Sequence, residues 1–176
     1  MTTMQGVQAP PASDGVLQRE LQQRRPFRSP AQEAAIAMLR TADVVRRRLA
    51  AAVEPAGITL AQYNVLRVLR GSNPTPLATY EIAERLIEQT PGVTRLLDRL
   101  ESQGWVSRTR CTEDRRLVHC RITEDGLALL ARLDAEVDAA DEAAVGALSN
   151  DDVAVLVRLL GHVRQGCGAE HPTADD

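Results

Sequence analysis

The stretch Gln89–Val106, QTPGVTRLLDRLESQGWV, decides how the rest of the chain is interpreted. Its apolar residues recur at intervals of three and four, which places their side chains on one face of an α-helix. They are Val93, Leu96, Leu97 and Leu100. Thr90 followed by Pro91 is typical of a helix N-terminus, and Gly104 is typical of the residue just beyond a helix. We therefore predict an amphipathic helix that begins at Thr90 and ends before Gly104.

On both sides of this helix the pattern changes. Upstream, residues 80–88 predict another short helix, with Thr79 as a possible cap and inward-facing Ile82, Ala83, Leu86 and Ile87. Downstream, the period shortens to about two residues, which predicts strands at Val106–Arg110 and Leu117–Ile122 with a polar turn at 112–115. Two short helices followed by a basic hairpin are the pattern of a winged helix-turn-helix.

The flanking segments predict longer helices. One runs over 31–54 and is stopped by Pro55 and Gly57, and a second begins at Thr59 and reaches about Arg70. After Thr123 a long helix is predicted to about Leu148. Ser149 then caps a last helix whose apolar stripe is Val153, Leu156, Leu160 and Val163. The predicted fold class is mainly α with a small two-stranded β wing, a winged helix-turn-helix joined to a helical dimerisation region.

Composition supports a helical, soluble protein. The chain has 176 residues and is 44% hydrophobic, but only 2% aromatic, which favours aliphatic helices over a β-sandwich. No apolar run approaches the ~18 residues that a membrane span needs, and no secretory signal is visible. We expect a cytoplasmic protein with no membrane partner. Three cysteines, an odd number, argue against a disulfide scaffold.

Charge is unevenly distributed along the chain, although the net charge is only −3. All 21 basic residues are arginine. Residues 90–121 carry seven arginines and four acids, net +3, whereas residues 122–176 carry three arginines and twelve acids, net −9. A basic segment followed by an acidic one indicates that one surface meets phosphate while another does not.

The predicted winged helix-turn-helix implies double-stranded DNA as a partner, because the second short helix fits the major groove and an arginine-bearing hairpin can reach the minor groove. Arg108 and Arg121 are expected to contact phosphate or to lie on the solvated face of the wing. Asp98 and Arg99 could instead form only surface or intrahelical ion pairs, which is the alternative to DNA contact for Arg99. Asp114 is expected to hold Arg115 or Arg116 in position. The predicted DNA-binding residues are Gln89, Thr90, Gly92, Thr94, Arg95, Arg99, Arg110, Arg115 and Arg116.

Three stretches together resemble the MarR-type regulators. The segment 89–106 resembles their recognition helix, and Glu113-Asp-Arg-Arg116 followed by Arg121-Ile-Thr-Glu-Asp-Gly126 resembles their wing and the start of the next helix. Gly57-Ile-Thr-Leu-Ala-Gln-Tyr63 resembles the start of their second helix. The resemblance covers about residues 31–165.

This resemblance implies a homodimer that binds a pseudo-palindromic operator, commonly as a repressor released by a small phenolic or lipophilic effector. It implies an effector pocket between the dimerisation helices and the DNA-binding lobe. The domains predicted are a disordered tail (1–30), a helical dimerisation region (31–57 and 123–166), a winged helix-turn-helix lobe (58–122) and a polar tail (167–176). No cofactor and no catalytic residue is expected.

Rival interpretations use the cysteines and histidines. Cys111 and Cys120 lie in the wing, and Cys111 stands between Arg110 and Arg115, whose charges could lower the pKa of its thiol and permit a redox switch. Cys111 with His119 could form a nucleophile–base pair of an enzyme, although nothing in the sequence orients them. His162, Cys167 and His171 could suggest a metal sensor, but their spacing matches no recognised site, so no metal is predicted. A winged helix used only for protein contacts is the last rival.

Overall fold

The computed structural model describes residues 15–88, 92–110 and 117–168. The chain divides by contacts into two units, residues 1–45 and residues 46–176, and each is described by itself. The first unit holds the short helix α1 (Val16–Glu20) and the larger part of α2 (Pro30–Val53). The prediction of a disordered tail over 1–30 is therefore wrong at α1. One turn of helix after Gly15, at φ 74°, is too short to show an apolar period.

The second unit begins with the end of α2, whose bounds agree with the predicted helix to within a residue. The 3₁₀ turn η1 (Glu54–Ala56) follows, and Gly57 ends it with φ 74°. Helix α3 (Leu60–Ser72) starts with a capping box, in which Thr59 Oγ1 accepts from the Gln62 backbone N–H at 3.2 Å. Gln62 Oε1 accepts in return from the Thr59 backbone N–H at 2.9 Å.

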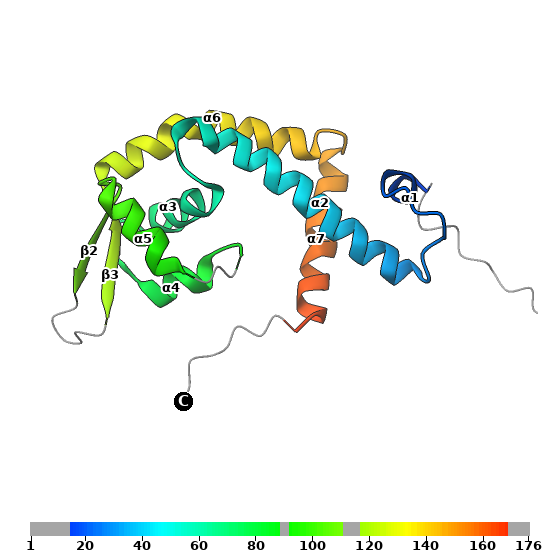
Figure 1. Cartoon of the computed structure of the whole chain (residues 1–176), viewed down its shortest axis with the longest axis horizontal. Coiled ribbons are helices and arrows are strands. Elements are labelled where there is room, and N and C mark those ends of the chain that lie inside the picture. Colours follow the sequence, from blue (N-terminus) through cyan, green and yellow to red (C-terminus); the bar gives the residue numbers. More distant parts are fainter. Residues whose placement is uncertain (1–14, 89–91, 111–116, 169–176) are drawn as a thin grey trace, which may run out of the picture. The chain divides into compact units, whose positions relative to one another are not determined.

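The core of this unit is aliphatic and is centred on α3. In Figure 1, α3 lies between α6 (Glu124–Val145) and α4 (Thr79–Arg85), and α3 packs against α4, α5 (Val93–Ser102) and α6. The largest fully buried side chains of this core come from α3, α4, α5 and α6, and also from the end of α2 and from the wing. They are Val53, Val65, Leu66, Leu69, Ile82, Leu97, Leu100, Cys120, Leu129 and Leu130.

The sheet has three strands rather than the two predicted. Strand β2 (Val106–Arg110) pairs antiparallel with β3 (Val118–Ile122) to form the hairpin, and β1 (Leu77–Ala78) pairs with the other edge of β3. Leu77 lies opposite Cys120 in this register. Two residues are too few to show alternation, so β1 could not be found from the sequence.

Two predicted helix boundaries are wrong near the centre of the motif. Helix α4 ends at Arg85, and Ile87, expected to face inward, is 67% exposed. Helix α5 begins at Val93, because its N-cap Gly92 has φ 103° and interrupts any helical path from Thr90. Thr90 and Pro91 themselves lie outside the described residues. The C-terminal end agrees with the prediction, since Gly104 follows α5 with φ 76°.

Helix α7 (Asn150–Gly166) is capped by Ser149, as predicted, but has no buried residue. The preceding helix α6 ends at Val145, three residues before the predicted end. The apolar stripe of α7 remains accessible, with Leu156 37% and Val163 38% exposed. In the part of the chain described, no helix is long and apolar enough to cross a bilayer.

Candidate nucleic-acid interface

Helix α5 is held by one face and open on the other. Val93, Leu97 and Leu100 are buried against the core, which confirms the predicted apolar stripe. On the opposite side the polar side chains are exposed, and Gly92 is exposed at the start of the helix. The exposed predicted DNA-binding residues of α5 are Thr94, Arg95 and Arg99. Gln89 and Thr90 lie outside the described residues.

The wing is a hairpin of β2 and β3 in which only part of the predicted site is described. Arg110 ends β2 and is exposed, in register opposite Val118. The remaining wing predictions, Asp114, Arg115 and Arg116, lie outside the described residues, as does Cys111.

Arg108 does not project freely from the wing. Its Nε and Nη2 donate to the same carboxylate oxygen of Glu101, at 2.8 and 2.6 Å, and Nη2 also lies 2.7 Å from Asp98 Oδ1. The hydrogen bond to Glu101 is the main cause that raises the pKa of Arg108 above its usual value, against a smaller opposing effect of burial. The expectation of a phosphate contact or a solvated arginine is therefore wrong for Arg108, because two acids of α5 hold it.

Arg121 is likewise tied to the protein. It is exposed on β3, and its Nη1 donates to the backbone carbonyl of Pro74 in the loop before β1. This contact links Arg121 to the loop between α3 and β1. The sequence carried no sign of it, because 47 residues separate the two partners.

The junction between α5, the wing and α6 is closely packed. Thr123 Oγ1 donates to the Gly104 carbonyl at 2.7 Å and accepts from the Gly126 backbone N–H at 3.1 Å. The Thr123 backbone N–H donates to the Trp105 carbonyl at 3.0 Å. A Cβ on Gly126 would lie 2.4 Å from that same carbonyl oxygen. The Thr-x-x-Gly motif thus fixes where the wing ends and α6 begins.

Cys120 is placed where a redox-active thiol is not expected. Its side chain is fully buried, and burial raises its thiol pKa, outweighing a hydrogen bond with the Thr79 side chain and the charge of Arg108. Burial and a raised pKa both slow thiolate chemistry. The structure therefore speaks against Cys120 as the switch of a redox-sensing regulator.

The metal-sensor alternative rests on three residues near the end of the sequence, His162, Cys167 and His171. Among the residues that the structure describes, no three His, Cys, Asp or Glu side chains are grouped so that they could hold a metal ion. His171, the third donor of the metal-sensor alternative, lies outside that part of the chain.

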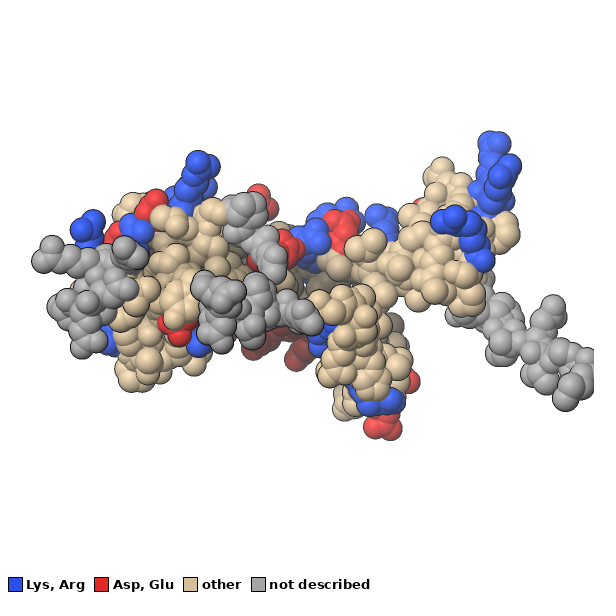
Figure 2. All heavy atoms as spheres, turned by 90° about the horizontal axis from the view of Figure 1, so that it is seen from below, with Lys and Arg blue, Asp and Glu red and all other residues tan. Residues whose placement is uncertain are grey.

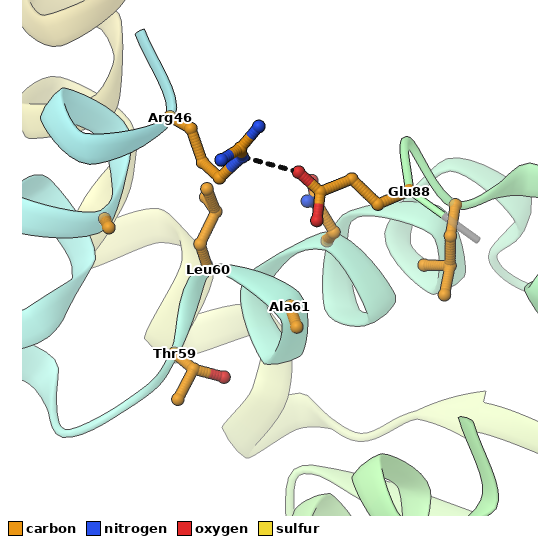
Figure 3. A pocket seen from close by; sticks show the side chains of 8 residues that line it. Arg46, Thr59, Leu60, Ala61 and Glu88 are labelled. Atoms are coloured by element: carbon orange, nitrogen blue, oxygen red, sulfur yellow. Dashed lines mark hydrogen bonds and ion pairs between the residues drawn. The ribbon is translucent and has the colours of Figure 1, made fainter. Parts of the chain in front are cut away.

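A cavity of about 260 Å³ lies between the end of α2, the start of α3 and the segment after α4 (Figure 3). Arg46 of α2 and Glu88 approach across it, with Arg46 Nε 2.6 Å from Glu88 Oε1. The other lining residues come from α2, the start of α3 and the segment after α4, and most are apolar. They are Ala50, Thr59, Leu60, Ala61, Asn64 and Leu86.

Charges of both signs are interspersed on the visible face of the winged lobe. Figure 2 shows arginine and acidic side chains next to one another at the end where the wing lies. The acids that pair with Arg108 belong to this lobe. The surface is therefore less uniformly basic than the count of arginines over 90–121 suggested.

Comparison with known proteins places this geometry in a family. The MarR family model matches residues 58–118. A MarR transcription factor of known structure from Planctomyces limnophilus is 38% identical, with a TM-score of 0.61 over 77% of this chain and 98% of that chain. A mutant MarR from E. coli, complexed with operator DNA, is 27% identical with a TM-score of 0.70 over 79% of this chain and 99% of that chain.

A curated relative, the HTH-type transcriptional regulator PecS from Dickeya dadantii (strain 3937), is 28% identical over 109 residues. The match spans 61% of this chain and 66% of PecS, just under two thirds of its length. These relatives are transcription regulators, which excludes the enzyme among the rival interpretations. The matched motifs, the winged helix and the extent of the match to the Planctomyces protein together show that this chain belongs to the MarR family of DNA-binding transcription regulators.

Proposed function

We propose that the chain is a sequence-specific regulator that binds a pseudo-palindromic operator as a homodimer and that α5 is its reading helix. The observation that carries this proposal is the division of α5 into a buried apolar stripe and an exposed polar face with Arg95 in its first turn. A helix held in this way can enter the major groove, where arginine pairs with guanine and threonine contacts the thymine methyl group. The E. coli relative that was solved in complex with operator DNA supports operator binding by this chain.

The wing arginines complete the proposed interface. Arg110, Arg115 and Arg116 would reach the adjacent minor groove and its phosphates, since narrow minor grooves attract arginine. Gln89, Thr90 and Gly92, just before α5, would meet the DNA backbone at the start of the reading helix. Asp114 would hold one wing arginine in its binding conformation.

Dimerisation is proposed from the helices that the single chain leaves uncovered. Helix α7 buries none of its residues although it carries Leu156, Leu159 and Val163. An amphipathic helix with an accessible apolar stripe needs a partner surface. We assign residues 31–57 and 123–166 to this dimerisation region.

A small phenolic or lipophilic effector that relieves repression is proposed for the cavity beside α3. Its volume suits a compact aromatic molecule, and its lining combines aliphatic side chains with the Arg46–Glu88 pair. Binding there would act on α2 and on the segment that leads into α5. The test is a shift in the melting temperature with a panel of phenols and aromatic acids. Repetition with Ala50→Leu, which fills the cavity, should remove the shift.

The DNA-binding assignment is tested on the duplex that the unmodified chain selects from a randomised pool, with a scrambled duplex for comparison. Arg95→Ala should lower the ratio of the two affinities by about fivefold or more, because one bidentate base contact contributes about 1–3 kcal/mol to discrimination. Arg116→Ala should weaken binding to both duplexes and reduce the salt dependence.

Arg132→Ala is the matched control, since it removes one exposed arginine from α6, outside α5 and the wing. It should leave the ratio of affinities unchanged. If Arg95→Ala and Arg116→Ala both retain the affinity of the unmodified chain at physiological salt, the assignment of the interface is wrong.

A further inference from the structure

Arg108 joins the wing to the reading helix through side chains alone. It occupies the third position of β2, and both of its partners lie on α5, one helical turn apart. Its side chain is 22% exposed, less than that of Glu101 at 39% or Asp98 at 53%. The side chain of Arg108 is therefore more covered than those of its two carboxylate partners.

The cluster is unfavourable for DNA binding if only charge is considered. Asp98 and Glu101 place two negative charges on the helix that faces phosphate, and the single charge of Arg108 leaves a net charge of −1. Two of the three guanidinium nitrogens already contact carboxylates, so Arg108 has little capacity to bind phosphate as well. A role in holding the interface together accounts for this arrangement where a role in attraction does not.

The cluster of Arg108, Asp98 and Glu101 connects the wing hairpin to α5. Helix α5 ends at Ser102 and β2 starts four residues later at Val106, so the hairpin is attached to the helix at its base. The pairing of β1 with β3 and the burial of Val106 and Cys120 also hold this part of the sheet to the core. Arg108 adds a side-chain link that joins β2 directly to α5, and its planar guanidinium has directional donors that oppose a change in the angle between the two elements.

We propose that Arg108, held by Glu101 and Asp98, is a positioning residue that sets the angle between α5 and the wing. The proposal rests on the function proposed above, in which α5 and the wing contact neighbouring grooves. The angle fixes the distance between contacts in the major groove and contacts in the adjacent minor groove. Arg108 therefore acts on discrimination between DNA sequences rather than on general attraction to DNA.

Removing the two acids tests whether the cluster positions the wing or merely repels DNA, because the two roles predict different changes in affinity for the selected and the scrambled duplex. In the double variant Asp98→Asn/Glu101→Gln, two negative charges disappear, so charge alone predicts tighter binding to every duplex. Positioning predicts that the ratio of affinities for the selected and the scrambled duplex falls, by about threefold to tenfold. The matched control is Glu84→Gln/Glu124→Gln, which removes two exposed acids, one from α4 and one from the start of α6, that form no ion pair with any residue in the described ranges. It should leave the ratio unchanged.

Arg108→Lys tests the same idea with the charge retained. Lysine cannot reproduce the fork of donors, so the ratio should fall by a similar factor while the salt dependence of binding stays that of the unmodified chain. Combining Arg108→Lys with Glu101→Gln should lower the ratio little further, because both changes disrupt one cluster. All measurements are made below the melting transition of each variant, since loss of stability alone lowers both affinities equally.

Two outcomes overturn the inference. One is equal tightening on both duplexes by Asp98→Asn/Glu101→Gln, and the other is an unchanged ratio of affinities in Arg108→Lys, which would mean that a positive charge alone is sufficient at this position. Arg95→Ala keeps these failures distinct from failure of the proposed function. If Arg95→Ala lowers the ratio and the cluster variants do not, only the positioning role is lost, whereas an unchanged ratio in Arg95→Ala refutes the reading role of α5.

Discussion

At the scale of single residues, Gly126 has the least room for change among the described glycines. It is buried in the first turn of α6, where a Cβ would meet the Trp105 carbonyl oxygen at 2.4 Å and Ile122 Cγ1 at 2.8 Å. The backbone of Trp105 cannot move away easily, because its carbonyl already accepts from the Thr123 backbone N–H. A side chain at this position must therefore push α6 away from the wing.

We expect Gly126→Ala to lower the free energy of unfolding by about 1–3 kcal/mol, the usual cost of overpacking a rigid site. Gly71→Ala is the matched control, since a Cβ there meets nothing within 4 Å and alanine favours the helical conformation. Urea unfolding followed by circular dichroism measures both. Equal stability of the two variants would mean that the junction is not closely packed.

Two buried side chains, the Cys120 thiol and the Tyr63 hydroxyl, make the free energy of unfolding depend on pH in the alkaline range. Burial raises the pKa of Cys120 above its ordinary value of 9.0 and that of Tyr63 above 10.0. A group whose pKa is raised on folding contributes its full stability below its ordinary pKa, and that contribution is lost as the pH rises through the folded value. The free energy of unfolding should therefore decline as the pH rises above about 9.

Cys120→Ala should show a smaller decline between pH 8 and pH 10 than the unmodified chain, because it removes one of the two groups responsible. Cys167→Ala, which removes an exposed thiol, should keep the full decline. Chemical unfolding at a series of pH values provides the comparison. An identical pH dependence in Cys120→Ala and the unmodified chain would show that the thiol does not contribute.

At the scale of elements, the capped helix starts are the features that the sequence predicts most closely. Thr59, Thr123 and Ser149 each accept from the backbone N–H of the third residue of the helix, as predicted from residue type. Capping depends on neighbours within four residues, so the sequence holds the information it needs. The predicted start of α5 is wrong, because Gly92, at φ 103°, is the N-cap and α5 begins at Val93.

Thr59→Ala should lower the free energy of unfolding by about 1 kcal/mol, because it removes the cap of the central helix α3. Thr59→Ser retains the hydroxyl and should stay within a few tenths of a kcal/mol of the unmodified chain. Thermal unfolding distinguishes the two. If serine costs as much as alanine, the methyl group of Thr59 in the cavity wall matters more than the cap.

At the scale of the whole molecule, the apolar face of α7 is the clearest feature that a single chain leaves unsatisfied. Leu156→Glu places a charge in this stripe and should convert the proposed dimer to a monomer, seen by sedimentation, with loss of binding to a two-half-site operator. Ala154→Glu makes the same change in charge two residues away, on roughly the opposite face of the helix, and should remain dimeric. A monomeric unmodified chain at micromolar concentration would refute the dimer.

The sequence alone determined the family, the helical class, the apolar stripe of α5 and the outward placement of Thr94, Arg95 and Arg99. These features follow from local periodicity and residue type, which depend on near neighbours in the chain. Only the tertiary structure placed β1 beside β3, buried Cys120, tied Arg121 to Pro74 and turned Arg108 from a presumed wing contact into a link with Asp98 and Glu101. Each of these depends on which elements meet in space, and whether an arginine faces DNA or a neighbouring acid is decided by that packing.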